Sequence, residues 1–401
     1  MPARFVLNIF LLATAAMAGI HHIELQSTSR LSSTRSHDNI SKRWDQAVLG
    51  SQSSKHGVEL WYAPGPLGLT VPAALGNPPQ PFRLLVDLTW DALFVPSADL
   101  DTRYTSPGDM FQYFSNESST FIPEPTGNRQ SVEYGLVDFD GDLVFDTFRI
   151  AGVETTHQPF INADSAHPAG WMDLWSGYDG ALGLSPGWDT PMNYSSTPSP
   201  WSVMVNQSVL DRNLFAIDVP RGGNYVDDPQ MGEMSFGGIN PKYDSSRFVA
   251  LPTIQHDDRM WAVEAQSVTW TNETHPIHHE FDNIMAVVTT DWIIALPGSM
   301  ARQIQESVSQ WTGCGFLWCF IDCDIRKRLP DFIFEIAGQN LTLTPFDYAP
   351  LTIGPGGQRL CSFDIWSSRA FHDRNSPIPE EALILGTPFL NAFYRLVYSL
   401  T

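Results

Sequence analysis

The feature that most constrains the fold is a segment that occurs twice in the chain. Residues 84–97 read Leu-Leu-Val-Asp-Leu-Thr-Trp-Asp-Ala-Leu-Phe-Val-Pro-Ser, and residues 285–297 read Met-Ala-Val-Val-Thr-Thr-Asp-Trp-Ile-Ile-Ala-Leu-Pro. In each copy an apolar run leads into a Thr-containing turn, and a second apolar run ends at Pro. The pattern predicts strand, tight loop and strand in both places, with the carboxyl group of Asp87 at the first loop.

A second sequence feature repeats at nearly the same spacing. Gly183 follows Asp87 by 96 positions, and Gly386 follows Val288 by 98, each within a Leu-Gly pair. Short alternating apolar runs and Gly-Pro turns dominate both halves, whereas only residues 298–311 carry apolar residues at helical spacing. We therefore expect an all-β chain of two lobes related by a pseudo-twofold axis, with the two loops meeting at a cleft between them.

Length and charge exclude several classes of protein. The chain has 401 residues, enough for two packed lobes, and its net charge of −21 is unsuited to binding nucleic acid. No Gly-rich phosphate loop occurs between a strand and a helix, and no Gly-x-Ser-x-Gly motif is present. We expect no cofactor and no nucleic acid partner.

The first 43 residues have the pattern of a secretory leader. An apolar run from Phe5 to Ala15 is followed by small residues, which predicts a signal peptide over 1–18. A polar segment then ends in Lys42-Arg43, which predicts a prosegment over 19–43 and a mature chain that begins near Trp44. No later apolar run is long enough to span a bilayer, so we expect no integral membrane anchor and a secreted, extracellular or vacuolar location.

The sequons and cysteines agree with export. Asparagine glycosylation is expected at five positions of the mature chain: Asn116, Asn193, Asn206, Asn272 and Asn340. The four cysteines form an even set, and disulfides are the default for such a set in an exported protein. Their spacing does not suit zinc, and the His-containing stretch 275–280 is interpreted as a solvated loop, so no metal site is expected.

The two copies of the repeated segment resemble the active-site loops of pepsin-like aspartic peptidases. In that family the first reads Asp-Thr-Gly-Ser followed by Asn-Leu-Trp-Val-Pro-Ser, and the second reads Val-Asp-Thr-Gly-Thr-Ser-Leu. The resemblance continues in family order over most of the mature chain, through Gly76–Gln80, Tyr134-Gly135, Phe145–Thr147, Asp179–Leu184, Gly232–Pro241 and Ile384–Leu390.

The resemblance implies specific roles. It gives lobes at 44–240 and 241–401, a flap hairpin that carries Tyr134, and a disulfide between Cys323 and Cys361, which leaves Cys314 to pair with Cys319. It also implies peptide hydrolysis by two carboxyl groups that share one proton, so that one activates water while the other protonates the carbonyl oxygen.

The chain departs from the family at both loops. Aligned through Pro96 and Pro297, Asp87 is retained but Val288 replaces the second catalytic Asp. Thr89 and Thr290 occupy the glycine positions, Leu88 has displaced the first Thr, and only Thr289 is left of the threonines that bond across between loops. Trp90 and Trp292 fall where the family has small hydroxyl residues, and we expect their indoles to line the floor of the cleft.

Three functions remain open from the sequence. The preferred one is a monomeric pseudopeptidase that lacks ordinary aspartic endopeptidase activity and binds a peptide-like or apolar ligand between the lobes. An alternative is an active hydrolase or small-molecule enzyme that uses Asp87 with or without Asp291, whose carboxyl group stands three residues after Val288. A purely structural or interaction role is a third.

Overall fold

The computed structural model describes most of the chain from residue 68 onwards. The described ranges are 68–100, 110–134, 137–168, 178–186, 197–219, 231–240, 248–254, 260–270, 276–308, 311–314, 319–353, 358–371, 378–393 and 395–398, with short strands at 8–10, 21–26 and 61–62. The predicted signal peptide and prosegment lie outside these residues except for the first two short strands.

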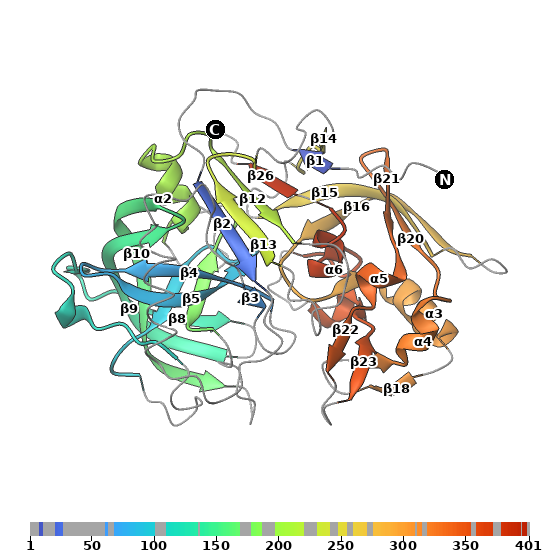
Figure 1. Ribbon diagram of the computed structural model, residues 1–401, viewed down its shortest axis with the longest axis horizontal. Helices are drawn as coiled ribbons and strands as arrows, with labels where there is room; N and C mark the ends of the chain where they lie inside the picture. The colour runs from blue at the N-terminus through green and yellow to red at the C-terminus, as the bar shows by residue number, and fades with distance from the viewer. Residues whose placement is uncertain are drawn as a thin grey trace.

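The described chain is mostly β, and its strands form three sheets. Figure 1 shows two bodies side by side, the first half of the chain at left and the second at right, with β12, β13, β2 and β26 above and between them. The predicted all-β, two-lobed architecture is confirmed.

The largest sheet has fifteen strands, most of them from the first half. They are β1 (Asn8–Phe10), β2 (His21–Gln26), β3 (Trp61–Tyr62), β4 (Leu69–Leu75), β5 (Gln80–Asp87), β6 (Leu93–Pro96), β7 (Ile122–Pro123), β8 (Arg129–Tyr134), β9 (Val137–Ile150), β10 (Val153–Pro168), β11 (Gly180–Gly183), β12 (Leu214–Asp218), β13 (Met231–Phe236), β14 (Phe248–Ala250) and β26 (Arg395–Tyr398).

The second half forms a seven-stranded and a four-stranded sheet. The seven strands are β15 (Ala262–Trp270), β16 (Ile277–Val288), β17 (Ile294–Leu296), β20 (Phe332–Ile336), β21 (Gln339–Leu343), β24 (Ile365–Ser367) and β25 (Leu383–Leu385); the four are β18 (Trp311–Cys314), β19 (Cys319–Ile321), β22 (Leu351–Ile353) and β23 (Arg359–Ser362). Residues 277–280, expected in a loop, instead begin β16.

Helices are short and few among the described residues. They are η2 (Ser115–Glu117), α2 (Pro200–Asn206), α3 (Gly298–Ser307), α4 (Cys323–Arg326), α5 (Pro345–Tyr348), η4 (Ser368–Phe371) and α6 (Thr387–Leu390). The helix predicted over 298–311 is present as α3, which buries Met300, Ala301 and Ile304. It ends earlier than predicted because residues 311–314 belong to β18.

The duplication predicted from the sequence is visible in the strand register. In the first half β11 lies between β5, to which it runs parallel, and β6, to which it is antiparallel. In the second half β25 lies in the same way between β16 and β17. Leu182 pairs with Leu93 just as Leu385 pairs with Ile294, so the two loops occupy equivalent places in two copies of one motif.

Each half has its own large apolar core, because alternate residues of these strands point to opposite faces. In the first half Leu84, Val86 and Leu93 enter one core, and in the second Ala286, Ile294 and Leu385 enter another. The rigid sheets thus hold the ends of β5 and β16, where the two loops begin, in fixed positions.

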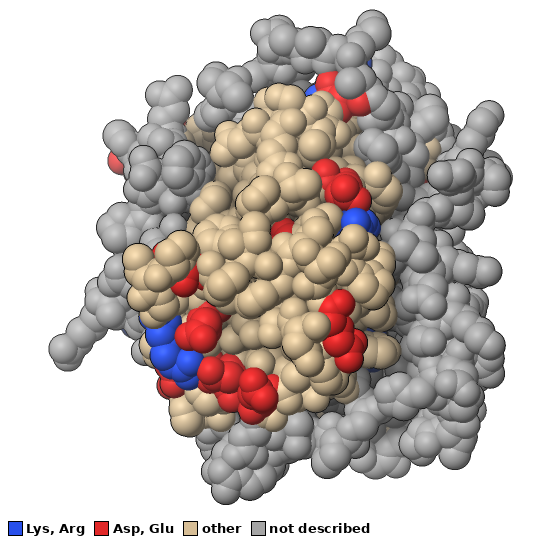
Figure 2. Space-filling view, turned by 90° about the vertical axis from the view of Figure 1, so that its left-hand side faces the viewer, with Lys and Arg blue, Asp and Glu red and all other residues tan. Residues whose placement is uncertain are grey.

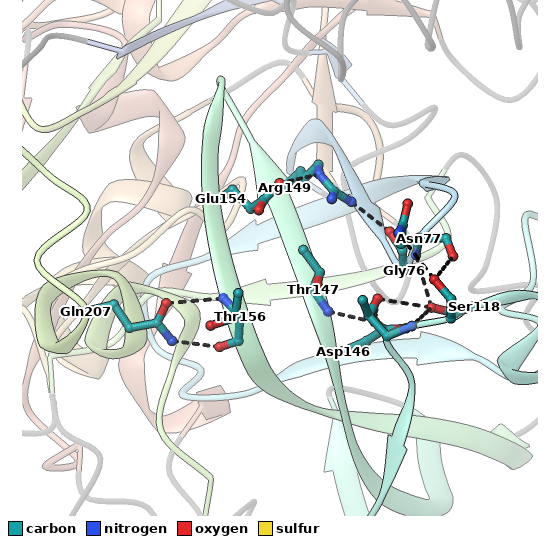
Figure 3. Close-up of polar contacts among 11 residues, drawn as sticks. Gly76, Asn77, Ser118, Asp146, Thr147, Arg149, Glu154, Thr156 and Gln207 are labelled. Carbon is teal, nitrogen blue, oxygen red and sulfur yellow. Dashed lines mark hydrogen bonds and ion pairs between the residues drawn. The ribbon is translucent and has the colours of Figure 1, made fainter.

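The turn between β4 and β5 is anchored to β9 by a polar cluster, which Figure 3 shows. Gly76 has a φ of +87°, and a Cβ there would lie 2.9 Å from Ser118 Oγ, so this turn requires glycine. Arg149 donates to the Gly76 carbonyl at 2.7 Å. Buried Asp146 accepts hydrogen bonds from the hydroxyls of Tyr113 and Thr120. The hairpin that carries Asp87 is therefore tied to its neighbours.

Figure 2 shows one outer face of the molecule, on which groups of acidic side chains lie beside basic ones on a largely uncharged surface. Among the ion pairs, Arg129 binds Asp164 at 2.5 Å and Asp142 at 3.4 Å, and Arg149 binds Glu154 at 2.7 Å. These pairs are on the surface, where each contributes little to stability.

Candidate functional site

The first loop holds the Asp87 carboxyl group in a defined orientation. Asp87 ends β5, and its Oδ1 accepts hydrogen bonds from Thr89 N–H at 2.8 Å, Thr89 Oγ1 at 2.7 Å and Trp90 N–H at 3.1 Å. Asp87 is half-buried, whereas Leu88 is buried in the core of the first half. Three donors on one oxygen fix the carboxyl group at the end of the strand.

The second loop carries no carboxyl group at the equivalent strand end. Val288 ends β16, is half-buried, and packs against the apolar cluster that holds the core of the first half together with Trp261 of the second. Its backbone N–H donates to the carbonyl of Trp261 at 2.8 Å. An apolar side chain thus occupies the place at which the resemblance expects the second catalytic acid.

Asp291 brings a second carboxyl group to the site from a different position. It is an exposed residue, yet protein atoms crowd around its carboxyl group, and this loss of hydration is the main cause that raises its pKa to about 6. The negative charge of Asp87 is the second cause, while a hydrogen bond from Thr289 Oγ1 at 3.0 Å opposes the rise in pKa. Asp87 and Asp291 therefore lie close enough to interact electrostatically.

The two loops touch directly. Thr290 Oγ1 donates a hydrogen bond to the Val86 carbonyl, across 204 positions of sequence. The sequence analysis gave this bridging role to Thr289, and that expectation is wrong in the structure. Thr289 is buried, accepts a hydrogen bond from the Asp291 N–H at 3.0 Å and donates to the Asp291 carboxylate, so it organises its own loop.

Two further contacts join the halves beneath the loops. The indole N–H of Trp261 donates to the Leu184 carbonyl at 2.8 Å. A Cβ on Gly68 would lie 3.1 Å from the carbonyl oxygen of Thr290, so the chain before β4 is also close to the second loop. Sequence reasoning missed Trp261, because a lone tryptophan outside any motif gives no signal of such a contact.

The expectation that Trp90 lines the floor of a cleft is wrong, and for Trp292 it stays a prediction. Trp90 is 4 % exposed and lies in the apolar cluster of the first half, with its ring edge-on to Phe94 at 6.5 Å. Trp292 is half-buried and packs edge-on against Trp366 at 5.6 Å. The first indole is part of the core, and only the second reaches the surface.

The other predicted residues are placed as follows. Tyr134 ends β8 at the tip of a hairpin, where its backbone pairs with Val137, and its side chain lies outside the described residues. Asn116, Asn206 and Asn340 are exposed, whereas Asn193 and Asn272 lie outside the described residues.

The disulfide implied for the second half is present. Cys323 and Cys361 are bonded, with their Cα atoms 5.1 Å apart, and this bond joins α4 to β23. Cys319 is also disulfide-bonded, and its backbone pairs with that of Cys314 across β18 and β19.

Within the described part of the chain, no group of three or more His, Cys, Asp or Glu side chains is arranged to hold a metal ion. In the same residues, no helix is long and apolar enough to cross a membrane.

Comparison with known proteins agrees with this geometry. The sequence profile described as "Eukaryotic aspartyl protease" matches residues 70–401. The chain belongs to the eukaryotic aspartyl protease family.

Characterised members of the family are similar to this chain over most of its length. It is 27 % identical over 328 residues to Vacuolar protease A of Aspergillus fumigatus, which covers 82 % of this chain and 75 % of that protein. It is 26 % identical over 324 residues to Embryonic pepsinogen of Gallus gallus, which covers 80 % and 76 %. Pepsin A of Canis lupus familiaris is 26 % identical over 306 residues, 76 % of this chain and 72 % of that protein.

In this aspartyl protease family member, a glycine lies close to the backbone of each loop. A Cβ on Gly183 would meet the carbonyl oxygens of Ala92 at 2.5 Å and Trp90 at 2.6 Å. A Cβ on Gly386 would meet those of Asp291 at 2.1 Å and Ile293 at 2.3 Å. A Cβ cannot lie less than 3.0 Å from backbone atoms, so both positions require glycine. The glycine of each Leu-Gly pair therefore allows its strand, β11 or β25, to pass close to the backbone of the loop.

Proposed function

We propose that this aspartyl protease family member is a secretory pseudopeptidase that binds an extended peptide between its two loops without ordinary aspartic endopeptidase activity. The observation that carries the proposal is the Val288 side chain, which packs against the core of the first half from the strand end opposite Asp87. The ordinary mechanism places one water between two carboxyl groups, and an isopropyl group can neither orient that water nor transfer a proton.

The retained features support peptide binding. Asp87 is held by three donors, and the loops are joined by the Thr290 hydroxyl, so the floor of the site is organised although one catalytic group is replaced. Residues 87–91 and 288–292 contain three acids, Asp87, Asp91 and Asp291, and no basic residue, so the two loops offer an acidic and apolar surface to a peptide. Export is supported by the leader pattern and by the exposed asparagines of the sequons; we infer a monomer.

The test uses protein secreted from the full-length sequence and purified after any processing. We expect a statine-containing hexapeptide to bind in calorimetry at pH 5, and a denatured protein substrate to remain uncut between pH 3 and 6. Asp87→Asn is the matched control, because it alters the retained acid while conserving its size. Cleavage by the wild type that is lost in Asp87→Asn contradicts the proposal.

A restoring variant makes this test sharper. Val288→Asp combined with Asp291→Thr rebuilds the second acid at its family position and places a hydroxyl residue beside it. Detectable cleavage by this double variant, with none by the wild type, would show that Val288 is the cause of inactivity.

One observation favours a second function, an acid hydrolase that uses Asp87 and Asp291. The charge of Asp87 contributes to the raised pKa of Asp291, so below about pH 6 Asp291 carries a proton beside the other acid. Such a pair predicts activity that falls as pH rises through about 6 and that is lost equally in Asp87→Asn and Asp291→Asn. Activity that survives in Asp291→Asn excludes this mechanism.

A further inference from the structure

The two edges of the seven-stranded sheet in the second half are built differently. One edge is β24, where the side chain of Gln305 in α3 donates a hydrogen bond to the Ile365 carbonyl at 2.9 Å. The other edge is β21, which among the described residues pairs with β20 alone (Figure 1). About half of the backbone N–H and C=O groups of β21 therefore point away from its neighbouring strand.

The sequence of β21 lacks the features that keep an edge strand from pairing with another chain. Gln339–Leu343 contains no charge and no proline, and its register with β20 runs without a bulge. By contrast β8, which pairs with β9 alone in the described part of the chain, carries Arg129 and Glu133. Leu341 and Leu343 are fully buried in the core of the second half, so β21 is held firmly in place. It presents a fixed, uncharged row of backbone donors and acceptors.

A glycosylation sequon lies on this edge strand. Asn340 and Thr342 are both exposed, because they alternate along β21 with the buried Leu341. The other exposed asparagines of the predicted sequons, Asn116 and Asn206, lie in the helices η2 and α2. Among the described sequons, the one at Asn340 is thus the one on a strand edge.

Two copies of β21 are able to pair antiparallel about a twofold axis at Leu341. This register sets Asn340 of one copy directly opposite Thr342 of the other, with their Cβ atoms about 5 Å apart. A glycan on Asn340 occupies that space and excludes the second copy by its bulk. Without the glycan, the facing side chains are small and uncharged, and no residue of β21 opposes the pairing.

We propose that β21 is an edge for self-association and that an N-glycan on Asn340 blocks it, which keeps the exported chain monomeric. The partner excluded is a second copy of this chain, because an antiparallel pair of identical strands is self-complementary about a twofold axis. The inference is independent of what binds between the two loops, and it rests on the export that the leader pattern predicts.

The test compares two variants that both destroy the sequon at the same position. Thr342→Gln leaves β21 without glycan and without charge, whereas Thr342→Lys has a side chain of similar length that adds a charge to the edge. The purified secreted proteins are compared by sedimentation equilibrium from about 2 to about 200 μM, a range suited to weak association. We expect the weight-average mass of Thr342→Gln to rise by up to about twofold with concentration, while the wild type and Thr342→Lys stay monomeric.

Two further measurements separate the edge from other effects of glycans. Mass spectrometry of peptides from the wild type should find Asn340 glycosylated. Asn116→Gln removes a sequon from η2 instead of an edge strand, and it should stay monomeric over the same range of concentration.

The outcomes are distinct. A Thr342→Gln protein that stays monomeric, equal association in Thr342→Lys or Asn116→Gln, or an unmodified Asn340 in the wild type overturns the proposal. If Thr342→Gln is retained in the cell as aggregates while Thr342→Lys is secreted, the proposal is supported, because both variants lack the glycan and differ in charge alone. If neither variant is secreted, the glycan is needed for folding, and its role as a block on the edge is wrong.

Discussion

The two loops of this protein contain the same three residue types in different order. The first reads Thr89-Trp90-Asp91 and the second Thr290-Asp291-Trp292, and the strand register makes these triplets equivalent. In the first, the tryptophan is buried and packs against Phe94; in the second, the same position holds an exposed acid.

The difference shows that one backbone course can place different side chains at the same position. Gly183 lies under the carbonyl of Trp90, and Gly386 lies under that of Asp291, so the backbone course is shared. The residue at the equivalent position differs. In the first half the indole of Trp90 lies in the core, and in the second the carboxyl group of Asp291 lies near Asp87. Exchange of two neighbouring residues thus separates a packing loop from a loop that carries a displaced acid.

The largest effect is expected from removal of the buried indole. Trp90→Ala should lower the free energy of unfolding by about 3–5 kcal/mol, because it leaves a cavity in a sealed cluster. Trp292→Ala should lower it by only about 1–2 kcal/mol, because its ring is half-buried. Urea denaturation of the two variants measures the contrast, and equal losses would show that the loops are packed alike.

The next effect concerns Asp364, a buried acid at the start of β24. Its Oδ2 accepts from Ser362 Oγ at 2.7 Å, while Oδ1 has no hydrogen-bond partner among the described residues. Burial raises the pKa of Asp364 to about 8. In the first half, the strand register places Pro159 at the equivalent position, so this titration belongs to the second half alone.

The sign of the pH effect follows from proton binding. Between pH 4 and 8 folded Asp364 keeps a proton that the unfolded chain releases, so stability should fall as pH rises across that window and then level off. Asp364→Asn should flatten the curve and stabilise the protein at pH 8 by a few kcal/mol, on the order expected for a buried acid. Thermal unfolding at a series of pH values tests this. An unchanged slope between pH 6 and 8 would contradict it.

A smaller effect is expected at the contact between the loops. Thr290→Val removes the buried hydroxyl that donates to the Val86 carbonyl and should cost about 1–2 kcal/mol, because the hydrogen bond between the loops is lost. Thr89→Val, at the equivalent position, removes a donor to the half-buried Asp87 and should cost less. Urea midpoints of the two variants compare the loops directly. A greater loss of stability in Thr89→Val than in Thr290→Val would contradict this prediction.

The smallest effect is a shift in titration. Because the charge of Asp87 helps to raise the pKa of Asp291, Asp87→Asn should lower the pKa of Asp291 from about 6 towards the ordinary value of an aspartate. Carbon-13 NMR of labelled carboxyl groups measures this shift, with the pKa of Glu124 in the first half as the internal reference. A pKa of Asp291 that does not move would show that crowding alone perturbs it.

Much of the fold could be predicted from the sequence, because strand periodicity and the repeated segment are local patterns. The equivalence of Asp87 and Val288 could be predicted in the same way, since both end an apolar strand before a Thr-containing turn. The burial of Trp90 and Trp292 could not be predicted, because whether an indole enters a core depends on partners such as Phe94 and Trp366 on other strands. The bridge made by Thr290 depends on contact between halves 204 positions apart, which no local pattern records.

The glycine beneath each loop has a consequence for descent. Gly386 has no room for even a methyl group, and this holds whether or not the residue at 288 can take part in chemistry. The acid at position 288 can therefore be replaced by mutation while the steric requirement at position 386 still demands glycine. The Leu-Gly pair can thus persist in a chain of this family whatever residue occupies the catalytic position.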